Sequence, residues 1–411
     1  MRILILTQYF PPETGAPQNR LYALATRLQQ KGVEIVVLTA LPNYPQMEIY
    51  EAYRGKKYVY EEIGGLPVHR SGIYVSTNRS IISRLRNYFS FVYSSYWAGR
   101  KIKGPFDYVF CESPPLFLGI TARLLARRMK AGMIFNVSDL WPESAERLGL
   151  VTNSLMLGMA RKLEEHLYRH SALITGQTKG IVADILGRFP NKKVYWLPNG
   201  ADIQGGFIPE LSGTPWRKEN GFTADDFIFM YAGIIGHAQG LEVILKAAAR
   251  IKDRKNIKFV IVGSGPEKEK LQNLKITLDL DQVHFVDAVT KKDMPSVIAG
   301  TDVALIPLRK LDLFKGAIPS KLFENLIMKK PLLLGVEGEA KELFIHEAKA
   351  GLAFVPEDDQ DLAAKALEMA HNRAMVNSMG ENGYHYVYTH FNRDLLTDQF
   401  LVYLNETVNT K

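Results

Sequence analysis

The charged residues most suggestive of chemistry lie around position 320 of this 411-residue sequence. A basic loop follows Pro307, and the pair Pro319–Ser320 then precedes Lys321 and Glu324. Proline favours the first turn of a helix, where free N–H groups and the helix dipole attract anions. Lys321 in that turn suits a phosphate, and Glu324, about one turn later on the same face, suits the two hydroxyls of a ribose. The alternative is an ordinary surface pair near a helix start.

Two glycine-containing loops lie upstream of this segment. The loop YAGIIGHAQG follows an apolar run, so Gly233 and Gly236 would let backbone amides approach a diphosphate. His237 in the same loop would add a hydrogen bond or would simply be solvated. The run GSGPE at 263–267 lacks the third glycine of a dinucleotide fingerprint, so a tight turn before a helix is the better interpretation.

Two loops in the first half of the chain carry polar residues after apolar runs. In FPPETGAPQNR, Glu13, Gly15 and Arg20 would meet an anionic or polar ligand, or the loop is only a rigid turn. In FNVSDLWPES, Asp139 comes just past a strand, with Trp141 and Glu143 close behind. A carboxylate and an aromatic ring suit a sugar hydroxyl and a sugar face, whereas a helix N-cap at Ser138 or Asp139 is the alternative.

The segment 80–103 interleaves aromatic and basic side chains, and residues 54–103 hold ten Lys or Arg against two Glu. This composition predicts an amphipathic helix at an anionic membrane surface, or else a buried aromatic helix with a basic end. Nucleic-acid binding is not favoured, since no recognisable module surrounds the segment. The residues expected at the membrane are Arg84, Arg86, Phe89, Phe91, Tyr96, Trp97, Arg100 and Lys101.

The elements that must position these residues form two α/β series. Apolar runs at 3–7, 33–39, 108–111, 133–137 and 173–175 alternate with helical periods at 18–31, 116–128 and 153–170. A second series follows, with strands at 227–231, 258–262, 283–285 and 303–307 and helices at 241–251, 267–274 and 294–299. Strand, helix, strand at these lengths predicts parallel, doubly wound sheets. Residues 200–216 are interpreted as a linker.

We therefore predict two Rossmann-like domains, 1–200 and 201–385, that face a central cleft, and a C-terminal helix at 386–411 packing back towards the first domain. A chain longer than about 300 residues is expected to form more than one domain. The formal net charge is +8, and Cys111 is the single cysteine, so no internal disulfide is possible. We find no metal-binding pattern, secretion signal or membrane-spanning stretch, and expect a cytoplasmic protein.

In their order and spacing, several of these segments resemble one known family. PPETGAPQ, PNGAD, FVIVGSGPEKEKL, VHFVDAV and IPSKLFENLIMKKPLL match family 4 of the retaining glycosyltransferases, which have the GT-B fold. DLWPES, YAGIIGHAQGL and FKGAIPSKLFE are similar to its colanic-acid, O-antigen and capsule branch, which includes N-acetyl-L-fucosamine transferases. The resemblance covers nearly the whole chain.

The resemblance implies a retaining, metal-independent transferase that uses a UDP-sugar, with an N-acetylated aminosugar as the expected donor. The expected acceptor is linked to polyprenyl diphosphate at the inner leaflet, and the enzyme is expected to associate there peripherally. Asp139, Lys321 and Glu324 are the implied catalytic residues, and Glu13, Gly15, Arg20, Trp141 and Glu143 would bind the acceptor. The donor residues would be Gly233, Gly236, His237, Val286, Arg309, Ile318, Pro319, Ser320, Lys321 and Glu324.

The sequence also departs from the family. The first of two glutamates usual in the family is replaced by Gly316, and Ile235 and Gln239 stand near the places of the usual Arg and Lys. Arg309, Lys315 or Lys321 must then offset the charge of the diphosphate. Rival functions on the same fold are a nucleotide-sugar 2-epimerase, a glycan phosphorylase and a non-catalytic binding protein.

Overall fold

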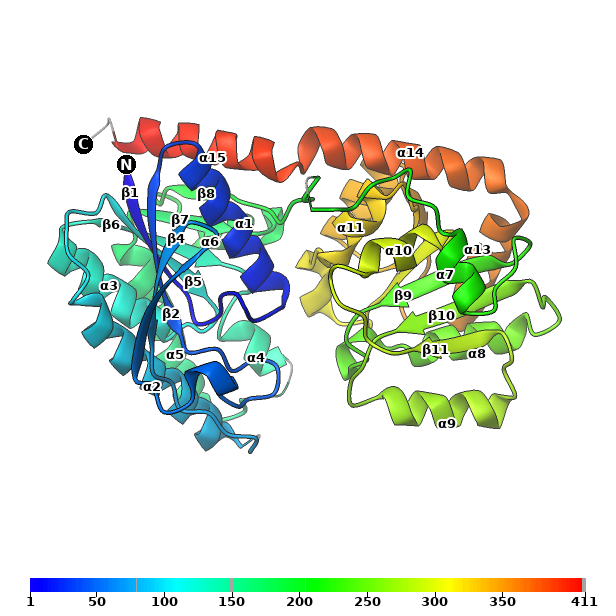
Figure 1. The fold of residues 1–411 in the computed structure, drawn as a ribbon, viewed down its shortest axis with the longest axis horizontal. Coiled ribbons are helices and arrows are strands. Elements are labelled where there is room, and N and C mark those ends of the chain that lie inside the picture. Colours follow the sequence, from blue (N-terminus) through cyan, green and yellow to red (C-terminus); the bar gives the residue numbers. More distant parts are fainter. Residues whose placement is uncertain (79, 148, 150, 204, 409–411) are drawn as a thin grey trace. The chain divides into compact units, whose positions relative to one another are not determined.

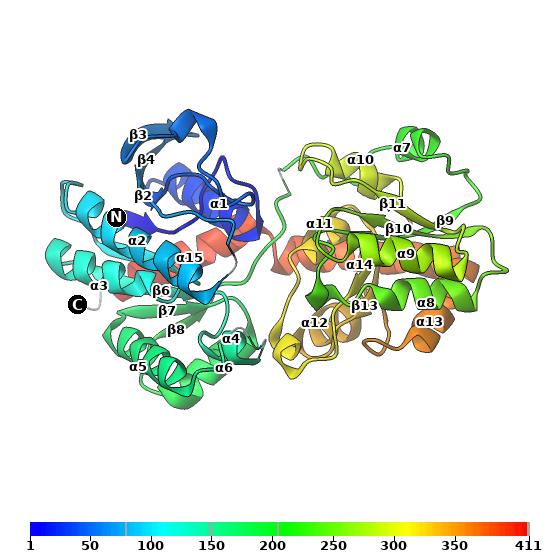
Figure 2. The ribbon, with the colours of Figure 1, turned by 90° about the horizontal axis from the view of Figure 1, so that it is seen from below.

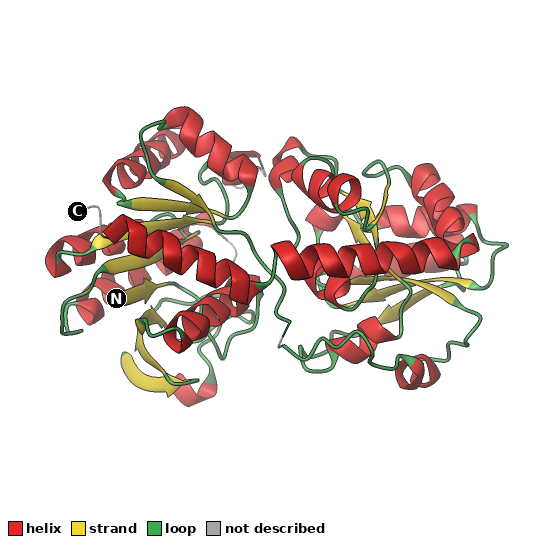
Figure 3. Ribbon diagram, turned by 90° about the horizontal axis from the view of Figure 1, so that it is seen from above, coloured by secondary structure: helices red, strands yellow, loops and turns green. Residues whose placement is uncertain are grey.

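The computed structural model describes residues 1–78, 80–147, 149, 151–203 and 205–408, and the chain forms two compact units. Unit 1 comprises Met1–Asn199 and Asp394–Lys411, and unit 2 comprises Gly200–Arg393. The sequence prediction placed the two domain changes at residues 200 and 386. In each unit, strands lie between helices (Figure 3).

Unit 1 contains one sheet and its covering helices (Figure 1). Its strands are β1 (Arg2–Leu6), β2 (Glu34–Ala40), β3 (Tyr58–Ile63), β4 (Leu66–Ser71), β5 (Tyr108–Ser113), β6 (Gly132–Val137), β7 (Leu173–Gly176) and β8 (Val194–Trp196). Its helices are α1 (Ala16–Gln30), the short 3-10 helix η1 (Glu51–Tyr53), α2 (Ile81–Gly99), α3 (Leu118–Met129), α4 (Glu143–Arg147), α5 (Ser154–His170), α6 (Lys179–Arg188) and α15 (Arg393–Val408).

The strand order in unit 1 is β3-β4-β2-β1-β5-β6-β7-β8, and the sheet is parallel except that β3 is antiparallel to β4. Alternate residues of β1 enter two cores: Leu4 and Leu6 pack with α2, α3, α5 and α6, whereas Ile3 and Ile5 pack with α1 and α15. Helices α2 and α3 lie side by side on the first of these faces (Figure 2). The order in which successive strands join the sheet reverses between β1 and β5, and parallel sheets of this type bind ligands at such a point.

Unit 2 repeats this architecture with a smaller sheet. Its strands are β9 (Phe227–Ala232), β10 (Ile257–Val262), β11 (Val283–Val286), β12 (Val303–Pro307), β13 (Leu332–Gly335) and β14 (Gly351–Ala353). Its helices are α7 (Thr214–Glu219), η2 (His237–Gln239), α8 (Glu242–Arg250), α9 (Lys268–Leu278), α10 (Met294–Ala299), η3 (Asp312–Gly316), α11 (Lys321–Ile327), α12 (Glu339–Lys341), the π-helical η4 (Glu342–Glu347), α13 (Asp359–His371) and α14 (Arg373–His390).

The six strands of unit 2 are all parallel, in the order β11-β10-β9-β12-β13-β14. Phe229 on β9 pairs in register with Phe259 on β10, and both rings are fully buried. The core around them includes apolar residues of α8 and α13, whose spacing places one apolar face on the sheet. The strand order reverses between β9 and β12, so the candidate residues after these two strands flank the expected ligand position.

The predicted α/β class and its two parallel sheets are confirmed; one hairpin was not predicted, and the linker prediction is wrong at its end. Residues 58–71 form the β3–β4 hairpin, which the strand pattern did not reveal. The predicted linker at 200–216 contains the start of α7, because Trp216 is buried and stacks on Phe222. None of the helices in the described ranges is both long enough and apolar enough to cross a membrane.

Candidate functional site

Glycines at the carboxyl ends of β9 and β10 bring three loops of unit 2 together. A Cβ on Gly263 would overlap the carbonyl oxygen of Gly233, and one on Gly265 would overlap that of Ile235. The Ile235 amide donates to Ser264 at 2.9 Å, and the Gly263 amide donates to the Val286 carbonyl at 3.0 Å. GSGPE is therefore a packing turn, and its role is to hold the 233–240 loop in place.

Lys321 begins α11 and reaches the end of β9. Its Nζ lies 3.8 Å from the centroid of the Tyr231 ring, a cation–π contact, and a Cβ on Gly233 would lie 2.7 Å from it. Within the described residues the ammonium makes no ion pair and no hydrogen bond. The side chain is partly exposed, but the protein around it desolvates the ammonium and lowers its pKa to about 7, against the opposing effect of Glu324. The cation thus lacks an anionic partner.

Glu324 lies one turn further along α11 and is also only partly exposed. Desolvation raises the pKa of its carboxyl group, while the charges of Lys291, Arg393 and Lys321 lower it. The structure gives this carboxylate no hydrogen-bond or ion-pair partner among the described residues. Lys321 and Glu324 thus lie near each other on α11, as predicted, and neither forms a salt bridge within the described residues.

Arg309 differs from Lys321 because its guanidinium already has partners within the protein. Its Nε donates to the His237 carbonyl at 2.8 Å, and its Nη1 lies 3.9 Å from Glu357. The exposed side chain of His237 has no described contact of its own, while its backbone helps to fix η2. Lys315 pairs with Asp312 at 2.8 Å. Of the three cations considered for the diphosphate, Lys321 alone is unpaired within the described part of the chain.

The remaining residues predicted to bind the donor shape the loops mainly through their backbone. Gly236 precedes η2 with an extended φ of −122°, and Val286 uses its carbonyl to hold Gly263. Ile318 and Ser320 are half-buried in the turn before α11, and the Pro319 carbonyl accepts the Leu322 amide at 3.1 Å. A cavity of about 380 Å³ includes Arg309 and Lys315 in its lining, which is formed by residues 308–312, 314, 315, 336, 337 and 356.

In unit 1 a buried polar network lies at the ends of β5 and β6, which the sequence analysis did not find. Glu112, 2% exposed, pairs with Arg20 and also accepts from Ser138 and from Asn136, the last at 2.6 Å. Arg20 donates to Ser138 Oγ at 2.9 Å. The available signal was a charged residue at the end of the apolar run YVFCES. The predicted residue Arg20 is thus part of the network, with Glu112 as its partner.

Asp139 directly follows Ser138 of this network. Its carboxyl group is open to solvent, yet surrounding protein atoms reduce its hydration and raise its pKa to about 6. The charge of Glu112 adds to the increase, and that of Arg20 opposes it. A carboxyl group that titrates near neutral pH can orient a hydroxyl in either protonation state.

Glu13 is buried, so the prediction that its side chain contacts the acceptor is wrong. It is 1% exposed, and its carboxylate accepts from the amides of Asn43 and Tyr44 at 2.8 and 2.9 Å and of Phe10 at 3.2 Å. It therefore holds the loop after β1 against the loop after β2. Gly15 is the N-cap of α1 and lies under the side chain of Gln18.

Trp141 and Glu143 also have structural partners. Trp141 is half-buried and packs against the core that contains α3 and α5. Glu143 opens α4 and pairs with Arg147 at 2.5 Å, four residues later on the same helix. Neither side chain joins the Glu112 network in the described structure. Of Asp139, Trp141 and Glu143, only Asp139 directly follows a residue of the network, and the charges of Glu112 and Arg20 act on its pKa.

Helix α2 divides its aromatic residues between core and solvent. Phe91 is fully buried, so its predicted place at a membrane is wrong, and Tyr96 also packs partly on the core. Phe89, Tyr93 and Trp97 are 46%, 69% and 46% exposed and recur at intervals of four residues. The exposed stripe of α2 consists of Ile82, Arg86, Phe89, Tyr93, Trp97 and Arg100. Arg84 is exposed near the start of the helix, while Arg100 lies 4.7 Å from the Trp97 ring and Lys101 5.7 Å from that of Tyr58.

Among the described residues, no group of three or more His, Cys, Asp or Glu side chains is placed to hold a metal ion. The candidate site of unit 2 consists instead of an unpaired ammonium, an unpaired carboxylate and a glycine loop. This set suits an anionic ligand that also carries hydroxyl groups.

Comparisons with known proteins agree with this geometry. Residues 15–200 match the model of the glycosyl transferase 4-like domain, and residues 213–386 match that of the glycosyl transferases group 1. A relative from Escherichia coli (strain K12), the putative colanic acid biosynthesis glycosyl transferase WcaI, is 27% identical over 331 residues, which are 78% of this chain and 80% of the relative.

Two solved structures share the fold over their whole lengths. Sucrose-phosphate synthase from Thermosynechococcus elongatus has a TM-score of 0.78 at 15% identity and covers 100% of both chains. The Anabaena protein HepE in complex with UDP-glucose has a TM-score of 0.72 at 14% identity, covering 99% of this chain and 100% of its own. The predicted GT-B fold is confirmed.

Proposed function

The chain belongs to the glycosyltransferases, and we propose that it transfers a sugar from a UDP-sugar to a lipid-linked acceptor in the synthesis of a bacterial surface polysaccharide. In this proposal unit 2 binds the donor and unit 1 binds the acceptor. The relative WcaI is described as a colanic acid biosynthesis enzyme, and HepE binds UDP-glucose. An N-acetylated aminosugar is the donor sugar that we propose.

The observation that carries the proposal is the unpaired Lys321 beside Gly233. A desolvated ammonium without an anionic partner is unfavourable in the free protein, and a diphosphate would supply the missing charge. Glu324, on the same face of α11, would accept hydrogen bonds from the ribose hydroxyls. In the transition state Lys321 would stabilise the charge that develops on the departing UDP.

For the acceptor, Asp139 is the proposed orienting residue. Retention of configuration without an enzymic base follows if the acceptor attacks on the face that UDP leaves and the leaving phosphate oxygen takes its proton. The protein would then have to position the reactants and stabilise charge. We propose that no metal ion is required, because Lys321 and backbone amides act at the diphosphate.

A thermal-shift screen of nucleotide sugars tests the donor assignment. A ligand at 100 times its Kd stabilises the folded state by about 2.7 kcal/mol. We expect UDP and a UDP-aminosugar to raise the melting temperature of the wild type and to have a much smaller effect on Lys321→Met. No stabilisation by any nucleotide or nucleotide sugar would contradict the proposal.

Three product assays test the chemistry. Transfer should continue in excess EDTA, and NMR of the product should show the same anomeric configuration as the donor. Loss of activity on chelation that Mg²⁺ or Mn²⁺ restores, or an inverted product, would contradict those parts. Conversion of a UDP-sugar into its 2-epimer without any acceptor would identify an epimerase instead.

We also propose that the exposed stripe of α2 rests on the inner leaflet of the membrane. Cations near an anionic surface contribute about 1 kcal/mol each, and interfacial aromatic rings add to this. Co-sedimentation with anionic liposomes should fall with ionic strength and with Arg86→Glu/Arg100→Glu. The matched control is Arg128→Glu/Lys130→Glu, which changes the same charge at the end of α3. Equal binding by wild type and both double variants would contradict the membrane assignment.

A further inference from the structure

A second cavity, of about 150 Å³, opens in unit 1 where α2 begins. Tyr9 from the loop after β1 lines one part of it, and Arg84 and Tyr88 from the first turns of α2 line another. Ser and Asn side chains at positions 76, 78, 83 and 87 complete most of the wall, with Met47 as an apolar member. The described lining residues include a cation and several hydrogen-bonding groups but no carboxylate.

The two phenol groups of this cavity are hydrogen-bond donors without acceptors. The Tyr9 hydroxyl accepts from Gln8 Nε2 at 3.1 Å, which leaves its own proton available, and within the described residues Tyr88 Oη has no hydrogen bond. Burial raises the pKa of both phenols, so both remain protonated at neutral pH. The two hydroxyls are close enough to influence each other electrostatically, and Arg84 acts on Tyr88.

The charge of Arg84 is likewise uncompensated. No ion pair to its guanidinium is found in the described part of the chain. The carboxylate that acts on Tyr9 is Glu13, whose oxygens are already occupied by three backbone amides. The N-terminal end of the 19-residue helix α2 adds its dipole to the same positive potential.

The wall of the cavity is held by buried amide groups. Gln8, 1% exposed, also donates to Asn87 Oδ1 at 2.9 Å, and Asn87 in turn donates to the Tyr74 carbonyl at 2.6 Å. These bonds fix Tyr9 relative to α2 before any ligand arrives. Donors that are already in place lose little entropy on binding, which favours a small ligand with several acceptor oxygens.

We propose that this cavity binds the diphosphate group of the lipid-linked acceptor, with Arg84 as counter-charge and Tyr9 and Tyr88 as hydrogen-bond donors. This inference rests on the proposed function. β1 and β6 are separated only by β5, so their ends are about 10 Å apart at the usual strand spacing. A sugar attached to the diphosphate would therefore extend towards Asp139, and the lipid would follow the exposed stripe of α2.

Inorganic pyrophosphate is the first probe, titrated calorimetrically into the full chain in the presence of saturating UDP, so that the donor site is filled. We expect Arg84→Gln to weaken pyrophosphate binding about tenfold and Tyr88→Phe about fivefold. The control Arg128→Gln removes an exposed charge from α3, outside the lining of this cavity, and should leave binding unchanged. Equal affinities for wild type and Arg84→Gln would overturn the proposal.

UDP titrated alone separates this inference from the proposed function. If all variants bind UDP like the wild type and only pyrophosphate binding changes, the cavity assignment stands independently. If no variant and no wild-type protein binds UDP, the donor assignment fails, whatever pyrophosphate does.

A second experiment distinguishes an acceptor diphosphate from a phospholipid headgroup. KM is measured with a short-chain prenyl-diphosphate sugar without vesicles, and binding is measured with anionic phospholipid vesicles that lack this acceptor. Tyr88→Phe should raise KM for the diphosphate acceptor, leave kcat nearly unchanged and not affect vesicle binding. A defect confined to vesicles would assign the cavity to headgroups and overturn the acceptor assignment.

Discussion

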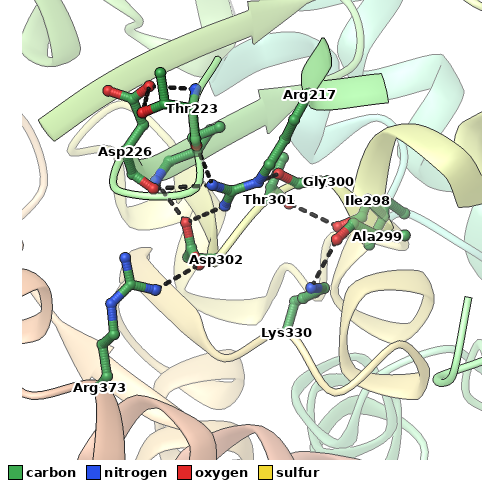
Figure 4. Close-up of polar contacts among 11 residues, drawn as sticks. Arg217, Thr223, Asp226, Ile298, Ala299, Gly300, Thr301, Asp302, Lys330 and Arg373 are labelled. Carbon is green, nitrogen blue, oxygen red and sulfur yellow. Dashed lines mark hydrogen bonds and ion pairs between the residues drawn. The ribbon is translucent and has the colours of Figure 1, made fainter. Parts of the chain in front are cut away.

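Charged residues at the two ends of the strands in unit 2 differ in whether they have partners. At the amino ends of β9, β12 and β13, charges meet in a closed network (Figure 4). Arg217 donates to Asp302 at 2.7 Å and to the carbonyls of Gly300, Thr223 and Asp226 at 2.7 to 3.0 Å. At the carboxyl ends of β9 and β12, Lys321 and Glu324 have no such partners among the described residues.

Both clusters are partly shielded from water, so exposure does not explain the difference. Arg217 and Asp302 each leave 16% of the side chain exposed, and Asp302 also accepts from the Ile228 amide at 2.8 Å. Arg373 adds a weaker contact to Asp302 at 3.5 Å. A shielded charge that is fully hydrogen-bonded stabilises a fold, whereas one that lacks a partner costs free energy until a ligand supplies it. The amino edge therefore maintains the fold, and we propose that the unpaired charges at the carboxyl edge serve to bind a ligand.

The largest expected effect is the loss of catalysis in Lys321→Met. Removing a cation aimed at developing charge should lower kcat/KM by about 100- to 1,000-fold. The melting temperature should stay the same or rise, because no ion pair is lost and an unpaired charge disappears. Steady-state kinetics and thermal melting of the same preparation measure both quantities. Lys365→Met, on α13 and paired with Glu368, is the surface control.

A melting temperature of Lys321→Met well below that of the wild type would contradict this prediction. Such a result would mean that Lys321 supports the fold as Arg217 does, and the contrast between the two edges would disappear.

Arg217→Met should show the reverse pattern, a loss of stability with donor binding retained. It leaves Asp302 without its strongest partner and several carbonyls without donors, a cost of about 2–4 kcal/mol. In a unit of this size each kcal/mol corresponds to about 2–4 °C, so the melting temperature should fall by roughly 5–15 °C. UDP affinity measured below the transition should match the wild type. Arg254→Met, an exposed arginine paired with an exposed aspartate, provides the control.

Glu324→Gln should have a smaller effect that depends on the ribose. A neutral amide is a weaker acceptor than a carboxylate, so we expect UDP to bind about five- to tenfold more weakly, or about 1–1.4 kcal/mol. Calorimetry with 2′,3′-dideoxy-UDP sharpens the test, since that analogue should lose affinity for the wild type and bind the variant almost as well. If the variant still discriminates as strongly as the wild type, the carboxylate does not bind the ribose.

The sequence was sufficient to predict most of the fold and to single out Lys321 and Glu324, the two unpaired charges on α11. Apolar runs of three to seven residues and helical periods located the strands from β5 to β7 and from β9 to β12. Lys321 and Glu324 were found because both lie within one short segment at a helix start. In such cases the physics is local, and spacing along the chain determines which side chains share a face.

Long-range contacts explain what the sequence did not predict. Arg20 and Glu112 are 92 positions apart, and nothing near either residue indicates the other. Glu13 looked like an exposed acid in a loop, but tertiary structure surrounds it with backbone amides from positions 43 and 44. The choice between Phe89 and Phe91 as the exposed ring depends on the rotation of α2 against its neighbours. These outcomes are decided by packing, which no local pattern records.

The smallest expected effect is proton uptake on donor binding. It tests whether the cation at the carboxyl edge, Lys321, changes its protonation state when the donor binds. In the free protein the pKa of Lys321 is lowered to about 7 from 10.5, so at pH 8 its amine is mostly neutral. A bound diphosphate favours the ammonium and raises that pKa again, so binding at pH 8 should take up a fraction of a proton that approaches one. At pH 6 the group is already charged, and the uptake should vanish.

Binding enthalpies measured in two buffers of different ionisation enthalpy give this uptake directly. The Lys321→Met variant should show none at pH 8. Arg217→Met should match the wild type, because the guanidinium that it removes stays charged throughout and contributes nothing to the uptake. The same shift has a consequence for stability: between pH 7 and 10.5 the unfolded chain binds the extra proton, so wild-type stability should rise with pH relative to Lys321→Met. Equal uptake in wild type and Lys321→Met would mean that the ammonium is charged before the donor arrives, and that both edges of the sheet hold their cations in the same state.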